Sequence, residues 1–311
     1  MSETMTREQR LFTPFLDPVD MVVCCLAETS LEQVNEEATR HGLRFPMVCD
    51  PAASLQEHVT AVDYAPGSAR FGPYVDNILG MNWELKSGTV VRVGERVIKS
   101  TTGYDLLRFL LHSDGRYGQA RDYVLRLRPR CDTTVQGVFR GEHEALERLR
   151  SAVLHSPWVH WLDAVNLHIS PNSETALEIE ADCANGEPAI FEEYFAQVAR
   201  ASGTAVFSHA EPRRGGLPVL SLKTTIGAAP SLARHLVRAH SGTARVLCVN
   251  GVVHYFPSPD QRPLASAVVE ELAAQCATEG GHIMGPWAGI AVPDDQETVW
   301  ANTLEATWNP L

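Results

Sequence analysis

The sequence predicts an α+β fold in which helices cover one face of an antiparallel sheet. Three observations predict it. Segments with helical apolar periodicity interleave with short strand-like runs. Two hairpin signals, Ser87-Gly88 and Asn250-Gly251, join neighbouring runs and so make them antiparallel. The length of 311 residues allows two domains with their own cores. We therefore expect one domain over 21–130 and a second over 131–311, after an arm of residues 1–20 with little structure of its own.

The first elements of 21–130 are expected to be a strand, a helix and a second strand. Met21–Ala27 is the first strand. Thr29-Ser30-Leu31-Glu32 fits a capping box that starts a helix, and the helix ends near His41-Gly42 with glycine just past its end. Phe45–Cys49 is the second short strand. The passage from Pro51 to Pro73 is expected to be rich in loops, because proline and glycine recur in it.

The stretch from Phe71 to Pro129 reads as a compact unit of strands, one helix and tight glycine turns. Its expected strands are Trp83–Lys86, Thr89–Val93 and Tyr123–Leu127, and its expected helix is Tyr104–His112. Asp114-Gly115 and Gly118 turn the chain into the last of these strands, whose alternation of Val, Leu and Arg suits a half-buried strand.

Beyond Arg130 the expected elements are longer. The strands are Thr133–Phe139, Ala176–Cys183, Thr204–His209, Leu217–Ile226, Arg245–Val249, Val252–Phe256 and His282–Trp287. The helices are Glu142–His155, Glu187–Ala201, Pro230–His240 and Pro263–Thr278. Pro188 in the first turn and Gly203 past the end of the second helix are typical helix boundaries.

The composition bounds the partners and the compartment. A net charge of −12 argues against nucleic acid or an anionic membrane as partner, because both attract basic surfaces. No apolar run approaches about 20 residues, so no membrane insertion is expected. The polar N-terminus lacks the apolar core of a signal peptide, and we expect a cytoplasmic protein. The seven cysteines form no Cys-x-x-Cys pair and are expected to be buried, reduced thiols.

The order of residues in the central stretch resembles a known family. The run Gly-Tyr-Asp-Leu follows Val-x-Lys, and glycines recur at the spacing of the second flavin-binding subdomain of the PCMH-type (vanillyl-alcohol-oxidase) FAD superfamily. The matching residues are Phe71-Gly72, Asp76-Asn77, Leu79-Gly80, Gly88, Gly94, Lys99, Gly103-Tyr104-Asp105-Leu106, Gly115, Gly118 and Leu125–Pro129. The most similar branch is the FAD-binding subunit of glycolate oxidase. The resemblance implies a partial PCMH-type FAD-binding domain over 21–130 and an α+β cap domain over 131–311.

The resemblance also implies FAD as cofactor, a small hydroxy acid as substrate and oxidoreductase subunits as partners. The cofactor contacts that it implies are Gly72, Asn77, Gly80, Lys99, Gly103, Tyr104, Gly115 and Gly118. Taken by themselves, Gly103, Gly115 and Gly118 also have a simpler interpretation as turn formers. Where the family has a glycine pair against the FAD diphosphate, this chain has Gln56-Glu57, whose side chains and charge are unsuited to a phosphate.

A full family member has a further subdomain upstream, with a glycine-rich loop around the FAD pyrophosphate. About twenty residues precede the first strand here, and none of them is glycine. We therefore expect an N-terminally truncated relative in which that half of the flavin domain is missing.

Other polar residues offer weaker candidates, and no catalytic residue is assigned. His160, His168, His209 and His254 lie in strand-like segments where a relative would place its substrate pocket, but each alone is more typical of a structural histidine. Arg213-Arg214 could hold a carboxylate in two hydrogen bonds, although a solvated loop explains them as well. No spacing typical of a metal site occurs.

Two functions stay open. The first is a glycolate-oxidase-like FAD-binding subunit of a 2-hydroxy-acid oxidoreductase that is incomplete or depends on a partner chain. The second is a non-catalytic relative that has lost FAD and acts as a partner or regulatory subunit. A neighbouring polypeptide that supplies the missing subdomain would reconcile the two.

Overall fold

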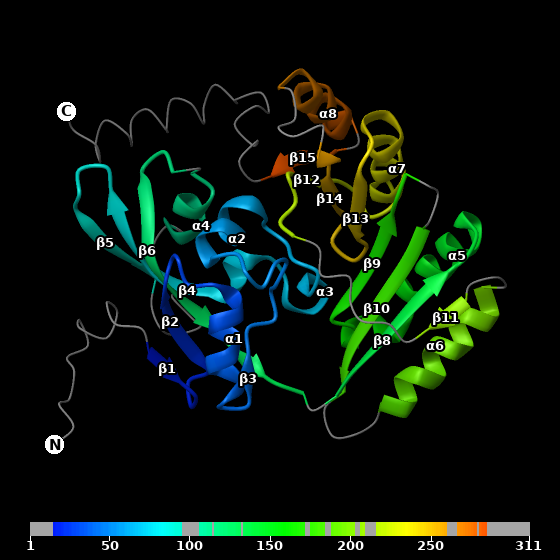
Figure 1. Cartoon of the computed structure of the whole chain (residues 1–311), viewed down its shortest axis with the longest axis horizontal. Coiled ribbons are helices and arrows are strands. Elements are labelled where there is room, and N and C mark those ends of the chain that lie inside the picture. The colour runs from blue at the N-terminus through cyan, green and yellow to red at the C-terminus, as the bar shows by residue number, and fades with distance from the viewer. Residues whose placement is uncertain are drawn as a thin grey trace. The chain divides into compact units, whose positions relative to one another are not determined.

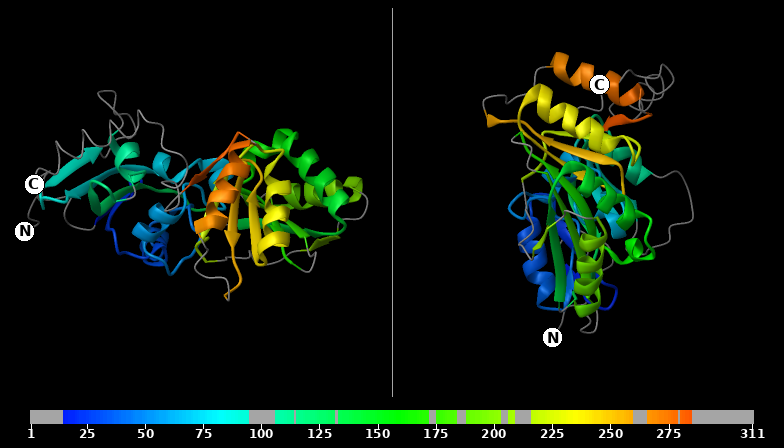
Figure 2. Two further views of the ribbon diagram at one scale, coloured as in Figure 1. Left: turned by 90° about the horizontal axis from the view of Figure 1, so that it is seen from above. Right: turned by 90° about the vertical axis from the view of Figure 1, so that its right-hand side faces the viewer.

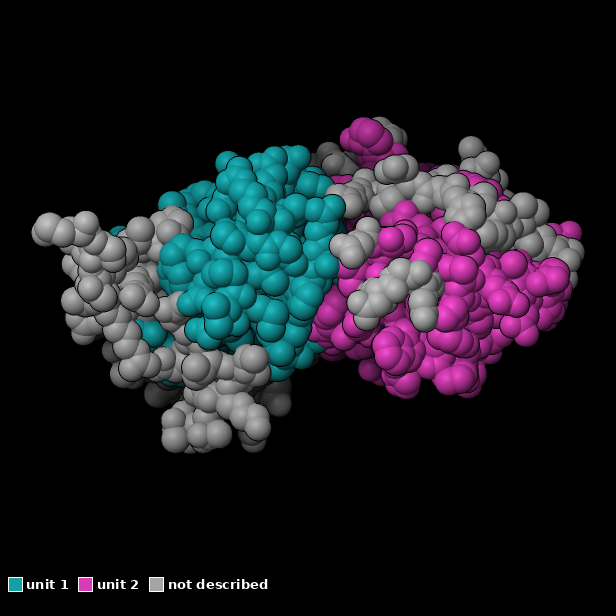
Figure 3. Space-filling view, turned by 90° about the horizontal axis from the view of Figure 1, so that it is seen from below, with its two compact units in different colours: residues 1–63, 73–130, 292–311 teal, residues 64–72, 131–291 magenta. Residues whose placement is uncertain are grey.

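The computed structural model describes residues 15–94, 106–113, 115–131, 133–171, 175–183, 188–202, 206–208, 216–259, 266–278 and 280–284. The course of the chain is shown in Figure 1 and, from two further directions, in Figure 2. The described residues divide into two compact units (Figure 3): unit 1 contains 15–63 and 73–130, and unit 2 contains 64–72 and 131–284. The short segment 64–72 therefore belongs with unit 2, although the chain on either side of it belongs to unit 1.

Unit 1 is built on a five-stranded antiparallel sheet with the order β1-β2-β6-β4-β5. Its strands are β1 (Phe15–Asp17), β2 (Val22–Leu26), β4 (Ile78–Leu85), β5 (Val90–Gly94) and β6 (Gly118–Arg126). The predicted hairpin is confirmed, since β4 pairs with β5 and Gly88 has the φ of 82° that suits a tight turn. β1 lies in the segment expected to be a structureless arm. It forms because Phe15 packs against the cluster of Val22, Cys24 and Val124.

Serine residues start two of the helices of unit 1. α1 (Leu31–Thr39) begins at Ser30, whose side chain and that of Gln33 form the capping box. The box lies one residue later than predicted at Thr29, because two overlapping patterns of the same kind occur here. α2 (Leu55–Ala61) begins at Ser54 with Glu57 as its reciprocal partner. Part of the expected loop passage is thus helical, because its prolines and glycines flank this helix instead of interrupting it.

The remaining short elements before residue 131 are α3 (Ser68–Phe71), which belongs to unit 2, and four in unit 1. These four are the 3-10 helix η2 (Tyr74–Asn77), α4 (Leu106–Leu111), β3 (Leu43–Arg44) and β7 (Arg128–Pro129). The helix predicted over Tyr104–His112 is confirmed for the part that the structure describes.

The strand predicted over Phe45–Cys49 is wrong. Phe45, Met47 and Cys49 are buried with the alternation of a strand, but the paired residues are Leu43 and Arg44, in β3. The backbone of Phe45 is satisfied by a side chain: its N–H donates to Asn35 Oδ1 at 2.7 Å, and its carbonyl accepts from Asn35 Nδ2 at 3.1 Å. A buried extended segment whose hydrogen bonds go to a side chain has the sequence pattern of a strand.

Unit 2 is built on an eight-stranded antiparallel sheet with the order β11-β8-β10-β9-β13-β14-β12-β15. Its strands are β8 (Thr133–Arg140), β9 (Ala164–Ile169), β10 (Thr175–Cys183), β11 (Val206–Ser208), β12 (Leu220–Lys223), β13 (Thr243–Leu247), β14 (Val252–Phe256) and β15 (His282–Met284). The predicted hairpin at Asn250-Gly251 is confirmed by the pairing of β13 with β14. β9, in the middle of the sheet, is not among the expected strand ranges, although the segment around His168 reads as strand-like.

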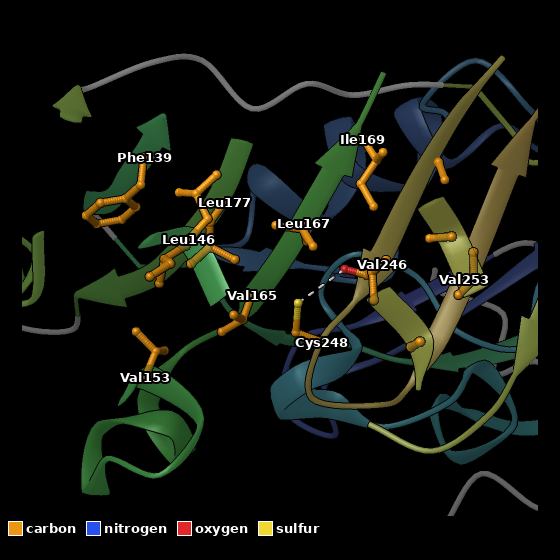
Figure 4. Close-up of a cluster of buried hydrophobic side chains, with 14 of the residues drawn as sticks. Phe139, Leu146, Val153, Val165, Leu167, Ile169, Leu177, Val246, Cys248 and Val253 are labelled. Carbon is orange, nitrogen blue, oxygen red and sulfur yellow. Dashed lines mark hydrogen bonds between the residues drawn. The ribbon is translucent and has the colours of Figure 1, made fainter. Parts of the chain in front are cut away.

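Helices cover one face of this sheet, as the α+β fold class predicts (Figure 1). They are α5 (His143–Leu154), α6 (Pro188–Ser202), α7 (Ala229–His240) and α8 (Ser266–Thr278), and the 3-10 helix η3 (Pro157–Trp161) follows α5. Their buried side chains join those of the strands in one core, part of which is drawn in Figure 4. Burying each large apolar side chain contributes about 1.5–3 kcal/mol relative to leaving it exposed, so this core holds the sheet and helices together.

Candidate functional site

Five of the eight predicted cofactor contacts lie in the described part of the chain, and Lys99, Gly103 and Tyr104 lie outside it. Asn77 is fully buried, and its side chain is already engaged within unit 1. Its Nδ2 donates to the Pro73 carbonyl at 3.0 Å, and its Oδ1 accepts from Arg128 at 3.0 Å. The amide therefore has a structural task, and its role as a cofactor contact stays a prediction.

The predicted glycines also have backbone roles. Gly118 has φ of 131°, and a Cβ there would meet the Glu84 carbonyl oxygen at 1.9 Å, so β4 and β6 approach closely only because this residue has no side chain. Gly115 and Gly72 have φ of 71° and 72° and make turns. Gly80 lies in β4 and pairs with Gly94 of β5 and Val124 of β6. Backbone geometry explains Gly72, Gly115 and Gly118, and the role of the predicted glycines as cofactor contacts stays a prediction.

The N-terminus of α2 carries Gln56 and Glu57 and does not fit a diphosphate. Glu57 Oε2 accepts from the Ser54 N–H at 2.7 Å and from the Ser54 hydroxyl at 2.8 Å. These hydrogen bonds lower the pKa of the Glu57 carboxyl, so the helix end already holds an anion. Gln56 accepts a hydrogen bond from the Tyr123 hydroxyl at 2.7 Å. A phosphate at this place would face a carboxylate instead of free N–H donors.

A different group of polar residues gathers on the sheet of unit 2. Side chains alternate across a strand, and most apolar ones of β8, β9, β10, β12, β13 and β14 face the helices. The opposite face carries a polar cluster that is largely buried. We call this cluster the polar face, and its residues are Asn166, His168, Glu178, Ser221, Arg245 and His254.

Four residues of the polar face form a row across successive strands. Arg245 lies opposite His168 on one side and opposite His254 on the other, and His254 lies opposite Ser221. Directly opposed residues of an antiparallel pair have Cβ atoms about 4.5–5.5 Å apart, so the four side chains are neighbours. Non-consecutive strands β9, β13, β14 and β12 contribute them, which explains why they are scattered in the sequence.

At the β9 end of this row, a histidine and a glutamate side chain are in contact. His168 Nε2 lies 2.7 Å from Glu178 Oε2, and the two side chains are only 12% and 6% exposed. A carboxylate at this distance fixes the orientation and tautomer of the imidazole. Glu178 also lies opposite Asn166, so both residues stand beside the row.

Toward β14 and β12, and on Asn166 beside the row, buried polar atoms lack hydrogen-bond partners among the described residues. Asn166 Oδ1 and Ser221 Oγ make no hydrogen bond of normal geometry within the part of the chain that the structure describes. The ring nitrogens of His254 make none of normal geometry either, although the ring lies against the backbone of Tyr64. These three residues are at most 2% exposed. Each unsatisfied buried group costs about 1–3 kcal/mol, so a polar ligand or water that reached them would recover several kcal/mol.

The Arg245–His254 end of the row holds one cation and neutral polar groups, whereas the other end holds the Glu178 carboxylate. Burial lowers the pKa of His254 to about 3, the positive charge of Arg245 lowers it further, and the backbone of Tyr64 opposes this only weakly, so the ring is neutral at pH 7. The Arg245 guanidinium stacks over Phe256 with its Cζ 5.7 Å from the ring centroid. Burial also lowers the pKa of Lys223, which lies on the same face. One guanidinium beside neutral hydrogen-bonding groups is a setting that suits a carboxylate.

The sequence predicted two members of the polar face, His168 and His254, among the weak histidine candidates. His160 is exposed in η3, and His209 and Arg213-Arg214 lie outside the described residues. Arg245, Asn166, Ser221 and Glu178 were missed. The signal that could have found them is the alternation of polar and apolar residues in β10, β13 and β14, combined with strand β9.

The described ranges offer neither a metal site nor a membrane-spanning helix. They contain no group of three His, Cys, Asp or Glu side chains placed to hold a metal ion. None of their helices is both long and apolar enough to cross a bilayer.

Comparisons with known proteins point to one superfamily. No protein-family model matches the chain. The mitochondrial D-lactate dehydrogenase (cytochrome) of Arabidopsis thaliana is 33% identical over 95 residues, which is 30% of this chain and 17% of that protein. The D-lactate dehydrogenase of Archaeoglobus fulgidus is 30% identical over 127 residues, 40% of this chain and 28% of that protein. Glycolate oxidase subunit GlcD of Bacillus subtilis is 30% identical over 64 residues, 21% of this chain and 14% of that protein.

A solved structure extends the likeness to nearly the whole fold. Alkyldihydroxyacetonephosphate synthase superposes with a TM-score of 0.63 over 95% of this chain and 63% of its own, at 10% sequence identity. This chain thus spans less than two thirds of that structure, and its alignments cover no more than 28% of the three enzymes named above. By partial sequence identity and by fold, the chain is a relative of the PCMH-type (vanillyl-alcohol-oxidase superfamily) FAD-linked oxidoreductases.

Proposed function

We propose that this chain is a glycolate-oxidase-like subunit of an FAD-linked 2-hydroxy-acid oxidoreductase, and that its polar face binds the hydroxy acid. The observation that carries the proposal is the buried row in which Arg245 stands between two imidazoles, beside Asn166 and Ser221, whose Oδ1 and Oγ atoms have no hydrogen-bond partner among the described residues. The chemistry of that row matches a 2-hydroxy acid, which combines one carboxylate with one hydroxyl group.

Each part of such an acid has a suitable counterpart. Arg245 can hold the carboxylate in two parallel hydrogen bonds, which fixes the plane of the acid. Neutral His254 and Asn166 offer acceptors for the hydroxyl group. His168, oriented by Glu178, is the base that we assign to the hydroxyl proton, because a nearby carboxylate stabilises a protonated imidazole. The chain's own residues thus bind the acid and accept its hydroxyl proton.

Retention of FAD requires more than the described residues of unit 1. The described residues of unit 1 do not form a diphosphate cradle, since Asn77 is engaged and Glu57 occupies the end of α2. We therefore propose that flavin retention depends on residues outside the described ranges or on a partner chain. A relative is itself named as a subunit, glycolate oxidase subunit GlcD. Cytoplasmic residence is part of the same proposal and rests on seven cysteines that are all free thiols.

An absorption experiment combined with calorimetry tests the proposal. Purified chain would be titrated with FAD and scanned from 350 to 500 nm, alone and after co-expression with the products of adjacent genes. In parallel, D-lactate and glycolate would be titrated into the same samples by isothermal calorimetry. We expect acid binding that Arg245→Gln weakens at least tenfold, and flavin retention that increases with the partner. Absence of acid binding in every sample would refute the proposal.

A second candidate function is a non-catalytic partner or regulatory subunit. The carboxylate of Glu57 at the α2 N-terminus favours it, because a protein under selection to hold the diphosphate there would not place a negative charge beside it. The same titrations separate the two candidates. A chain that stays colourless with every partner and binds neither acid is the non-catalytic subunit.

A further inference from the structure

Segment 64–72 lies against the polar side of the sheet of unit 2. Tyr64 packs on an apolar cluster of Leu247, Val252 and Met284, and the Lys223 Nζ atom lies 5.5 Å from the centroid of its ring. Leu247, Val252 and Met284 belong to the same sheet face as Arg245, His254 and Ser221, because they alternate with core residues along β13, β14 and β15. The chain's own tyrosine therefore covers part of this face.

Polar contacts fasten the segment behind Tyr64. Arg70 NH1 lies 3.3 Å from Asp163 Oδ1, and Asp163 is almost fully buried while Arg70 is partly exposed. The Asn250 side chain donates to the Ser68 carbonyl at 3.4 Å. The carboxylate of Asp163 also accepts the N–H of Asp182 at 2.8 Å, so it is rigidly placed. Two anchors of unit 2, Asp163 just before β9 and Asn250 in the turn between β13 and β14, hold the segment in one position.

Tyr64 stands where the polar row gives way to apolar surface. Met284 lies opposite Ser221, Val252 lies opposite Leu247, and Val252 is two residues from His254 on the same strand. The backbone of Tyr64 is also close enough to His254 to influence its pKa. An acid whose carboxylate binds Arg245 would direct a longer alkyl chain from the row toward this apolar cluster, which the Tyr64 ring already fills.

We propose that Tyr64 is a specificity-determining residue that restricts the polar face to short 2-hydroxy acids. The ring occupies the apolar surface on which the fourth and later carbons of a longer acid would be buried. Removing the ring exposes Leu247, Val252 and Met284 to such a chain. Each methylene buried there contributes about 0.8 kcal/mol, close to fourfold in affinity. This inference rests on the proposed function, because it assumes that the polar face binds the acid.

The test compares two acids that differ only in chain length. D-lactate and D-2-hydroxyhexanoate would be titrated by isothermal calorimetry into the full chain, with and without FAD, and the ratio of the two dissociation constants recorded. In Tyr64→Ala we expect the ratio to shift at least tenfold toward the longer acid. Tyr64→Leu keeps an apolar side chain on the cluster and should shift the ratio in the same direction. This variant provides the test if Tyr64→Ala folds poorly.

Two controls make the outcome specific. Tyr64→Phe keeps the ring and should leave the ratio unchanged. Tyr194→Phe removes the hydroxyl of a tyrosine in α6, on the helix side of the sheet, and should also leave the ratio unchanged. An unchanged ratio in both Tyr64→Ala and Tyr64→Leu, with lactate still bound, overturns the inference alone. Binding of neither acid by any variant overturns the proposed function and this inference together.

Discussion

Replacing Gly118 by alanine should destabilise unit 1 strongly, whether or not a cofactor is present. Gly118 has φ of 131°, and an added Cβ would lie 1.9 Å from the Glu84 carbonyl oxygen and 2.9 Å from Trp83 Nε1. Contacts below 3.0 Å essentially never occur for a real Cβ, so β4 and β6 must separate locally. The separation breaks the pairing of Gly118 with Leu85 and endangers the hydrogen bond from Trp83 Nε1 to the Tyr117 carbonyl.

The magnitude follows from these losses. Backbone strain at a positive φ costs about 1–3 kcal/mol, and each lost hydrogen bond costs about 0.5–1.5 kcal/mol. With two hydrogen bonds at risk, these terms amount to about 2–6 kcal/mol of unfolding free energy. Gly88→Ala is the matched control, because Gly88 also has a positive φ but nothing lies within 4 Å of an added Cβ. Its cost should be about 1–3 kcal/mol, the strain alone.

Native-state hydrogen exchange provides the assay. Peptides that cover β4 and β6 report the opening free energy of unit 1 separately from unit 2. We expect a difference of about 1–3 kcal/mol between the two alanine variants, from the two hydrogen bonds that only Gly118→Ala threatens, measured in the absence of FAD. If Gly118→Ala is no worse than Gly88→Ala, the close approach of β4 to β6 is not what this glycine serves, and a role toward a ligand becomes the better explanation.

Three further predictions concern charged and titrating groups. Asp163→Ala should lower the stability of unit 2 by about 2–3 kcal/mol in thermal unfolding, because a buried N–H and a guanidinium lose their acceptor, while Asp163→Asn should cost less; equal losses would contradict this. A hydrogen bond to Asp63 raises the pKa of His112 above 6.5, so its stabilising contribution is complete below that pH and lost as pH rises through the folded-state pKa; Asp63→Asn should remove this pH dependence from unfolding curves. Burial lowers the pKa of His254 to about 3, so the folded protein should lose stability as pH falls from 6.5 toward 3, by about 1–2 kcal/mol at pH 5. His254→Leu should flatten that part of the profile, and an unchanged slope would show that another group controls it.

Local signals in the sequence were sufficient for most elements. The hairpins at Ser87-Gly88 and Asn250-Gly251 depend on turn residues that are adjacent in the chain, and both form as predicted. The errors occur where a local pattern has two physical causes. Phe45–Cys49 alternates like a strand, but the Asn35 side chain satisfies its backbone. The passage with Pro51 and Pro66 contains α2, and in the sequence only the capping serine, Ser54, indicates this helix.

The candidate site could not be predicted as a group of residues from the sequence. The histidines His168 and His254 were noticed, but each alone is more typical of a structural residue. Arg245, which connects them, has no local feature that distinguishes it from other arginines in strands. The pairing of β9 with β13 and of β13 with β14 brings the three together, and residues 168 and 245 are far apart in the chain.

The sequence by itself determined the α+β class, the two hairpins, most helices and the resemblance to flavin-linked oxidoreductases, because periodicity, caps and turns act between residues near in sequence. Only the tertiary structure decided that Gly118 serves a close approach of β4 and β6, that polar side chains from four strands form one buried row, and that Tyr64 packs beside this row in unit 2. Strand register and packing set those features, and both depend on contacts between residues far apart in the chain.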